Sequence, residues 1–457
     1  MPTPLEISSQ TAAALVQEAQ TFSPAQIAAL QQERLNLLVD YARAHSPYLA
    51  DKYKNLPKAP ALKDIPVTLR TDAMEHFDAW VCDPKVTSAA LDKYLLDIEN
   101  AANPFLGKYT VLTTSGTTGI PLRMVRDSRH QAVNGALMAA RLLGGSKLHG
   151  VTLAPNMKSA GVLASGGYHS TYLSYVRAKR AYEQMGCPER FLPLFLDMST
   201  AEMVEKLNIF QPEMLTGYPS NMKLLALQQQ KGKLHIAPKA VGSSAEYLSP
   251  ETRELIEQAF GCPMIDNYCS TEGGELAMLC AHNRMHINTD WMILEPVDRD
   301  RNPVQSGRRS EGVLLTNLAN LVQPIIRYYI SDRILIDESP CPCGLPFPSL
   351  AIEGRQEDNL TFTDDNHEEV TVASSVFIQF SLHMPDCEQL QFVQTSPDEL
   401  QLRFTTEQDH ARVGAELKEL CEERFVREGI ANVTITVSEL PPLLGASGKM
   451  RNTMSLL

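Results

Sequence analysis

The spacing of apolar residues predicts helices in the first part of this chain and strands with helices further on. Residues 25–48 carry apolar positions at helical spacing, and we expect one long amphipathic helix there, ended by Pro47. A second helix is expected to begin at Ser249 and Pro250, because serine is a favourable N-cap and proline suits the first helical position. Residues 1–100 as a whole are predicted to be mainly helical.

Strand patterns begin after Asn103. Residues 109–114 form a β-branched strand that runs into a glycine-rich loop, and from there to about residue 350 short apolar strands alternate with helices. This alternation favours an α/β protein with a large layered body of mixed β-sheets and helices, residues 1–355. Residues 356–457 read as a small α+β domain, with strands at 399–405 and 433–440 and a helix at 407–428. The boundary is placed in the polar stretch 354–358.

Composition narrows the classes of protein and partner. Of the 457 residues, 44% are hydrophobic and 21% are charged, which excludes wholesale disorder. The 41 Lys and Arg against 54 Asp and Glu give a net charge of −13, which argues against nucleic acid as the partner. No signal peptide and no run of about 18 apolar residues is visible, so we expect no membrane segment and a cytoplasmic location with reduced cysteines.

The loop at residues 113–121 (TTSGTTGIP) is the first candidate for chemistry. Its hydroxyls and two glycines can bring many donors close to an anion such as phosphate. The loop is not a Walker A motif, since no Gly-Lys-Ser/Thr follows. Taken alone it also fits an ordinary surface loop.

This loop is one of five segments that resemble the signatures of the acyl-adenylate-forming superfamily. The others follow in the superfamily's order, as DNYCSTE (266–272), RYYISD (327–332), GRQED (354–358) and GKMR (448–451). Cys269 and Ser331 stand where glycine is usual. Residues 166–169, 218–220 and 241–246 are most similar to the phenylacetate–CoA ligase branch.

The resemblance implies an activity and its cofactors. ATP would activate a carboxylic acid as an acyl adenylate, with Mg²⁺ as the metal, and the acyl group would pass to CoA as a thioester. The protein's task in such a reaction is to position anions and neutralise developing charge. The C-terminal domain is expected to be mobile, rotating between the two half-reactions about the hinge motif at residues 354–358, with Glu357 at the pivot position.

The same resemblance assigns residues to roles. The residues expected to hold the β- and γ-phosphates are Ser115, Gly116, Thr117, Thr118 and Gly119. Those expected around adenine and ribose are Ser244, Ala245, Glu246, Asn267, Tyr268, Asp332 and Arg355. Thr271 would bond the α-phosphate, Glu272 would ligate Mg²⁺, and Lys449 would meet the charge that builds during adenylation.

The sequence leaves open whether the phosphate loop supplies a positively charged side chain. Related loops often carry a lysine soon after the proline, whereas Leu122 and Arg123 follow Pro121 here. Arg123 is either the substitute for that lysine or a solvent-facing side chain.

The acid is expected to meet an aromatic pocket. The resemblance puts Gly167, Tyr168, His169 and Tyr218 at the walls of this pocket. Three tyrosines and a histidine within residues 166–175 suit a flat, partly polar acid better than an alkyl chain, so we expect an aryl or arylacetic acid. His169 also fits a purely structural role.

A structural zinc site is predicted from spacing and from similar sets in relatives of phenylacetate–CoA ligase. Cys280, His286, Cys341 and Cys343 supply three thiols and an imidazole, enough for a closed tetrahedral site. His282 is the alternative imidazole, and four ordinary side chains are the alternative to a site.

Other functions stay open beside the CoA ligase. One is an adenylate-forming synthetase that passes its acyl group to an amine or a carrier protein, and another transfers AMP to a hydroxylated cofactor. A third is an inactive homologue that serves as a binding module, against which Ser115, Glu272, Asp332 and Lys449 argue. A homodimer is expected only as the commonest oligomer.

Overall fold

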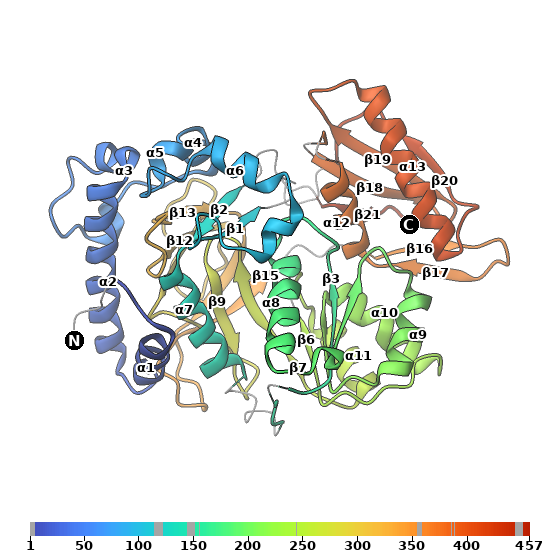
Figure 1. Cartoon of the computed structure of the whole chain (residues 1–457), viewed down its shortest axis with the longest axis horizontal. Helices are drawn as coiled ribbons and strands as arrows, with labels where there is room; N and C mark the ends of the chain where they lie inside the picture. Colours follow the sequence, from blue (N-terminus) through green and yellow to red (C-terminus); the bar gives the residue numbers. More distant parts are fainter. Residues whose placement is uncertain are drawn as a thin grey trace. The chain divides into compact units, whose positions relative to one another are not determined.

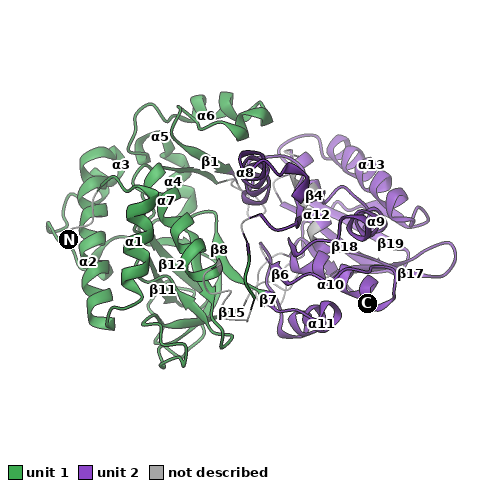
Figure 2. Cartoon of the chain, turned by 60° about the horizontal axis from the view of Figure 1, so that its bottom comes forward, with its two compact units in different colours: residues 1–112, 122–153, 265–354 green, residues 113–121, 154–264, 355–457 purple. Residues whose placement is uncertain are grey.

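The computed structural model of the chain describes residues 5–113, 122–143, 151–154, 156–243, 245–353, 359–384, 386–387, 389–443 and 451–457 (Figure 1). The chain divides into two compact units (Figure 2). The first contains residues 1–112, 122–153 and 265–354, and the second contains residues 113–121, 154–264 and 355–457. The domain boundary expected at residues 354–358 lies outside the described residues and stays a prediction.

The first unit carries the N-terminal helices. Helix α2 (Pro24–His45) covers the predicted amphipathic stretch, and a capping box between Ser23 and Gln26 fixes its start. Ser46 ends α2 and caps the next helix, which begins at Pro47, so this proline starts a new helix as well as ending the old one. The other helical elements are α1 (Ser9–Ala19), α3 (Pro47–Lys52), η1 (Leu62–Asp64), α4 (Arg70–Glu75), α5 (Phe77–Trp80), α6 (Ser88–Leu95), η2 (Ile98–Ala102), α7 (Ser128–Leu137) and η3 (Met138–Leu143).

The sheets of the first unit are antiparallel and small. One has the order β14-β15-β10-β9-β8, another β11-β12-β13, and β1 pairs with β2. Their strands are β1 (Thr110–Thr113), β2 (Arg123–Arg126), β8 (Asn267–Ser270), β9 (Gly274–Leu279), β10 (Met285–Ile287), β11 (Met292–Val297), β12 (Gly312–Asn317), β13 (Tyr328–Ile330), β14 (Arg333–Asp337) and β15 (Ser349–Glu353). Strand β12 is buried along its whole length and lies at the core of this unit.

The second unit is built on a parallel sheet of order β4-β3-β5-β6-β7. Helix α11 begins at Pro250 behind the cap Ser249, as the sequence predicts, and buries Ile256 and Phe260 against the sheet. The strands are β3 (Ser159–Leu163), β4 (Phe191–Phe195), β5 (Met214–Gly217), β6 (Ala240–Ser243) and β7 (Met264–Ile265). The helical elements are α8 (Ser170–Gln184), η5 (Pro188–Arg190), α9 (Thr200–Phe210), α10 (Pro219–Gln230) and α11 (Pro250–Phe260).

Residues 359–457 add a second sheet, of order β20-β19-β18-β21, to this unit. β16 and β17 pair with each other in a separate sheet. The elements of this part are β16 (Leu360–Thr363), β17 (Glu369–Val372), α12 (Ser374–His383), β18 (Gln389–Ser396), β19 (Glu399–Thr405), α13 (His410–Glu428), β20 (Thr434–Val437) and β21 (Thr453–Ser455). The core of this part also takes in Leu224 of α10. The predicted α/β class is therefore confirmed. Among the described residues no helix is both long and apolar enough to cross a bilayer.

Candidate nucleotide site and metal centre

The first unit brings three of the predicted nucleotide residues into one cluster. Tyr268 lies on β8 and is buried, and its hydroxyl donates to Asp332 Oδ2 at 2.6 Å. Asp332 is exposed and lies between β13 and β14. Burial, followed by the charge of Asp332, raises the pKa of Tyr268 well above its usual value. The hydroxyl therefore keeps its proton and holds the aspartate in one orientation.

Glu272 is the buried carboxylate of this cluster. It lies between β8 and β9, and its side chain is 7% exposed. Arg70 Nη2 donates to Glu272 Oε1 at 3.1 Å, and Arg70 Nε faces the Tyr328 hydroxyl at 3.4 Å. Burial raises the pKa of Glu272, and Arg70 opposes that rise. A buried carboxylate beside a second acid, Asp332, is suited to a divalent cation that carries phosphate oxygens.

Side chains from two other strands hold the main chain of the β8–β9 turn. Arg126 of β2 donates to the carbonyl oxygens of Ser270 and Thr271 at 3.1 and 2.8 Å. Asn317 of β12 donates to the carbonyl oxygens of Glu272 and Gly273 at 3.2 and 3.3 Å. Buried backbone carbonyls need such partners, and these fix the path of the turn.

The start of β8 is held through Glu275. Asn267 donates to Glu275 Oε2 at 2.5 Å, and the Glu275 amide donates to Asn134 Oδ1 at 2.9 Å. Gly274 has a φ of +78°, and a Cβ there would lie 2.2 Å from Asn134 Oδ1. Glycine is therefore required at 274 by backbone conformation and by space.

The second unit collects the remaining described candidates at one edge of its parallel sheet. Tyr168 and His169 follow β3, Tyr218 follows β5, and Glu246 follows β6. Strand β5 pairs with both β3 and β6, so these residues all follow the carboxyl ends of neighbouring strands. In open α/β sheets this edge is where ligands bind.

Hydrogen bonds and close packing hold the residues that are predicted to line the acid pocket. The hydroxyls of Tyr218 and Thr171 lie 3.0 Å apart, and burial raises the pKa of Tyr218. Gly167 has a φ of +72°, and a Cβ there would lie 2.6 Å from His169 Cδ2. His169 is partly buried, and burial lowers the pKa of its imidazole to about 4. The ring is therefore neutral at pH 7.

The segment expected to line adenine has an unusual conformation. Ala245 has a φ of +69°, which is costly for a residue other than glycine and recurs at functional sites. The Glu246 carboxylate accepts from the Ser220 amide and hydroxyl, both at 3.0 Å, and from the Ser374 hydroxyl at 3.3 Å. Glu246 therefore binds the first turn of α10, where a carboxylate is favourable.

Several predicted residues lie outside the described parts of the chain. They are Ser115, Gly116, Thr117, Thr118, Gly119, Ser244, Arg355 and Lys449. Arg123, the candidate cation after the loop, is described, and its Nη2 lies 2.7 Å from Asp92 Oδ1 in a partly exposed ion pair. The positive charge of Arg123 is therefore balanced by Asp92 on α6.

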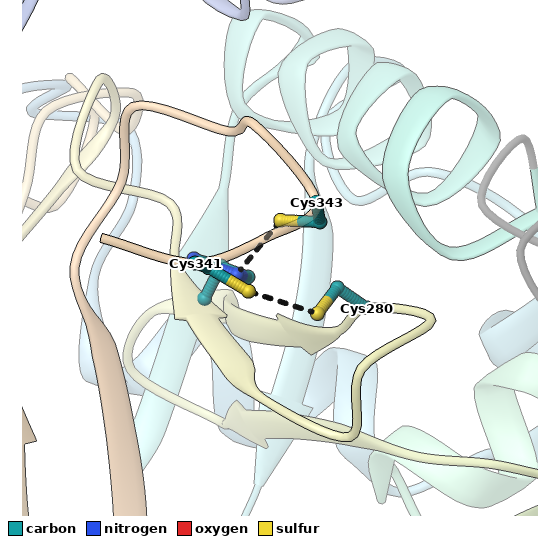
Figure 3. Close-up of side chains that lie close together, drawn as sticks. Cys280, Cys341 and Cys343 are labelled. Carbon is teal, nitrogen blue, oxygen red and sulfur yellow. Dashed lines mark hydrogen bonds between the residues drawn. The ribbon is translucent and has the colours of Figure 1, made fainter. Parts of the chain in front are cut away.

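The predicted metal ligands converge. Cys280 follows β9, His286 lies on β10, and Cys341 and Cys343 lie in the loop between β14 and β15. Strand β10 pairs with both β9 and β15, which brings these segments to one place. The four ligand atoms lie within 4.8 Å of one another, and Figure 3 shows the Cys280 and Cys341 sulfurs turned towards each other.

The distances in this cluster fit a tetrahedral zinc site. Cys280 Sγ and Cys341 Sγ are 3.7 Å apart, and Cys343 Sγ is 3.3 Å from His286 Nε2. Zinc–sulfur bonds of about 2.3 Å in a tetrahedron separate two sulfurs by about 3.8 Å. His286 Nδ1 lies 2.7 Å from the Phe347 carbonyl oxygen, so Nδ1 carries a proton and Nε2 presents its lone pair to the cluster. His282 contributes its main-chain amide to Cys280 Sγ.

The residues that hold the motifs in place carry little signal of their own in the sequence. Arg70, Arg126, Asn317 and Glu275 contact the DNYCSTE segment, and Arg70 lies 202 positions before its partner. Only Glu275 has a local signal, a second acidic residue three positions after Glu272.

Comparisons with known proteins give two relatives of similar sequence. No family model matches the chain. The phenylacetate–coenzyme A ligase of Thermus thermophilus is 25% identical over 475 positions, which cover 96% of this chain and 98% of that protein. Protein CapK of Staphylococcus aureus is 28% identical over 162 residues, and this match covers 34% of each chain.

Solved structures show the same fold. A crystal structure of 2-hydroxyisobutyryl-CoA ligase with 2-HIB-AMP and CoA matches 96% of this chain and 91% of its own, with a TM-score of 0.60 and 22% identity. An open conformation of that ligase has a TM-score of 0.57 at 21% identity and matches 96% and 93% of the two chains. The chain thus shares the fold of this acyl-CoA ligase. Its similarity to the Thermus ligase extends along nearly the whole length of both proteins.

Proposed function

We propose that this protein activates a carboxylic acid with ATP to an acyl adenylate and then transfers the acyl group to CoA. The observation that carries the proposal is the joining of Tyr268, Asp332 and Glu272 in one cluster, within a chain that is similar to an acid–CoA ligase over 96% of its length. The three residues come from two separate motifs, and their roles in nucleotide binding require them to be close.

The nucleotide would be held by groups that differ in charge and position. Asp332, oriented by the Tyr268 hydroxyl, would accept the ribose hydroxyls, and the tyrosine ring would cover adenine. Thr271 would bond the α-phosphate from a main chain that Arg126 already fixes. Glu272 would hold Mg²⁺, which would neutralise phosphate charge during acid attack.

The carboxylic acid substrate would bind at the carboxyl ends of β3, β5 and β6. Tyr168 and Tyr218 are buried there, and the neutral His169 ring adds a third flat surface. Such walls suit an aryl or arylacetic acid, because aromatic rings offer a large apolar area with a few polar atoms.

A structural zinc ion belongs to the proposal. The three thiols and the oriented imidazole would fill all four positions of the metal, which leaves none for substrate. Zinc would then tie the β9–β10 turn to the β14–β15 loop, next to the nucleotide motifs in sequence. The ion would contribute stability and no chemistry.

The test is acid-dependent exchange of labelled pyrophosphate into ATP. Aryl, arylacetic and alkyl acids are screened with Mg²⁺, and we expect the aryl or arylacetic acids to give the fastest exchange. No exchange with any acid, together with no binding of ATP or AMP, would overturn the proposal.

The acceptor is tested with the best acid from that screen. CoA and a panel of amines are added in turn, and products are identified by mass. We expect the CoA thioester. An amide as the sole product would assign the amide synthetase activity instead, and AMP on a hydroxylated compound would assign AMP transfer.

A further inference from the structure

The guanidinium of Arg70 occupies a defined position beside the carboxylate expected to hold Mg²⁺. Arg70 is the first residue of α4, and its Nη2 lies 3.1 Å from Glu272 Oε1. The side chain of Arg70 is 28% exposed while that of Glu272 is 7% exposed. The Arg70 side chain therefore extends from the partly exposed surface to the buried Glu272 carboxylate.

The main chain before Arg70 is anchored to the same part of the fold. The Thr68 amide donates to the Arg327 carbonyl oxygen at 3.0 Å, and the Tyr329 amide donates to the Thr68 carbonyl oxygen at 3.0 Å. Thr68 thus forms a parallel bridge beside Tyr328 of β13. Arg70 Nε also faces the Tyr328 hydroxyl at 3.4 Å. These contacts set the direction from which the guanidinium approaches Glu272.

The backbone and the side chain of Glu272 are held by different groups. Asn317 binds the Glu272 carbonyl oxygen at 3.2 Å, which fixes the peptide and leaves the side-chain torsions free. The contact that Arg70 makes is to the carboxylate itself, at Oε1.

The charges around Glu272 also single out Arg70. Asp332 adds a second negative charge near Glu272. Arg123, the candidate cation after the phosphate loop, is paired with Asp92 at 2.7 Å. Arg70 supplies positive charge directly at the Glu272 carboxylate.

We propose that Arg70 is the positioning residue that orients the Glu272 carboxylate for the divalent cation of the nucleotide. This inference rests on the proposed function, since it takes the cation to be the Mg²⁺ that accompanies ATP. Partners that orient a metal ligand typically change metal affinity by about 10- to 100-fold when they are removed. A planar guanidinium fixes its acceptor in a way that an ammonium does not.

The test compares Arg70→Gln and Arg70→Lys with the wild-type chain in two measurements. The first is the Mg²⁺ concentration that half-saturates pyrophosphate exchange. The second, independent of activity, is binding of Mn²⁺ in the presence of a non-hydrolysable ATP analogue, followed by electron paramagnetic resonance. For Arg70→Gln we expect both constants to rise by about 10- to 100-fold, and for Arg70→Lys by a few-fold.

The matched control is Glu295→Gln, which breaks the partly buried pair with Arg327 at 3.0 Å in the same unit. It should lower the melting temperature and leave both metal constants unchanged. Unchanged or lower constants for Arg70→Gln overturn the inference, because a lower value means that Arg70 competes with the cation. If Arg70→Gln does not fold, the constants for Arg70→Lys decide, and no rise overturns the inference.

Failure of the inference is distinguishable from failure of the proposed function. If no acid supports exchange in the wild-type protein, the function fails, whereas the Mn²⁺ measurement still reports on Arg70. If exchange is normal and the metal constants of both variants equal those of the wild type, the function stands and the inference fails.

Discussion

At the scale of single residues, His169 links the acid pocket to a measurable pH dependence. Burial lowers the pKa of its imidazole to about 4, against about 6.5 in an unfolded chain. Between these pH values the unfolded chain binds more protons than the folded one. The stability that comes from neutral His169 is therefore complete above about pH 6.5 and is lost as the pH falls towards 4. At pH 5 the loss is about 2 kcal/mol.

This prediction is checked by urea denaturation at pH 7.5 and pH 5.0. The wild-type protein should lose more free energy of unfolding between the two pH values than His169→Gln, by about 2 kcal/mol. Because other groups titrate equally in both proteins, the difference isolates His169. Equal losses in the two proteins would mean that the imidazole is protonated in the folded state.

The same scale shows what sequence motifs can and cannot predict. The resemblance of DNYCSTE and RYYISD to known signatures singled out Tyr268, Glu272 and Asp332, and the structure brings these three residues together. Arg70 gave no such signal. Its contact with Glu272 spans 202 positions and exists only once α4 is anchored beside β13.

At the scale of elements, a buried ion pair joins a helix to a loop in the first unit. Arg141 of η3 binds both oxygens of Asp290 at 2.8 Å, and the two side chains are 3% and 0% exposed. Breaking a buried pair from one side leaves an uncompensated charge, which costs about 3–5 kcal/mol. We expect Arg141→Met to lose that much stability in urea denaturation.

Two further variants separate charge from packing at this pair. Arg412→Met removes an exposed pair with Asp386 and should cost less than about 1 kcal/mol. Adding Asp290→Leu to Arg141→Met should recover part of the loss, since the Asp290 carboxylate is then no longer buried without Arg141. If the double variant is no more stable than Arg141→Met, lost packing and not unpaired charge explains the result.

The cysteine cluster gives a second prediction at this scale. Protein purified without added zinc should contain about one equivalent of zinc, because three thiolates and an imidazole form a closed site. Cys343→Ser should lower that content and the melting temperature together, whereas Cys187→Ser, a thiol outside the cluster, should change neither. Zinc far below one equivalent in the wild-type protein would contradict the site.

Element boundaries were largely predictable and element pairing was not. The sequence predicts α2, α11 and α13 because caps, prolines and amphipathic spacing act locally. The order β4-β3-β5-β6-β7 depends on which strands pair at long range. That order is what aligns Tyr168, Tyr218 and Glu246 at one edge, and no local pattern encodes it.

At the scale of the whole molecule, the compact units are not continuous in sequence. Residues 154–264 and 355–457 share a unit because Leu224 packs in the core of the C-terminal part. Arg424 of α13 also donates to the carbonyl oxygens of Leu196 and Met198. Composition changes along a chain can suggest where a segment begins, but they carry no information about such contacts.

The last prediction concerns Lys449 and the two half-reactions. If the C-terminal domain brings this lysine to the acid and the α-phosphate during adenylation, Lys449→Ala should slow pyrophosphate exchange by about 10²- to 10³-fold. Transfer of a preformed acyl adenylate to CoA should slow far less, because no carboxylate attacks the α-phosphate in that step. Lys418→Ala, an exposed lysine of α13 near Glu422, is the matched control and should leave both rates unchanged. Because both half-reactions use the same nucleotide and acid pockets, an equal loss in both would indicate general damage to the site. A loss confined to exchange would instead assign Lys449 to the adenylation step.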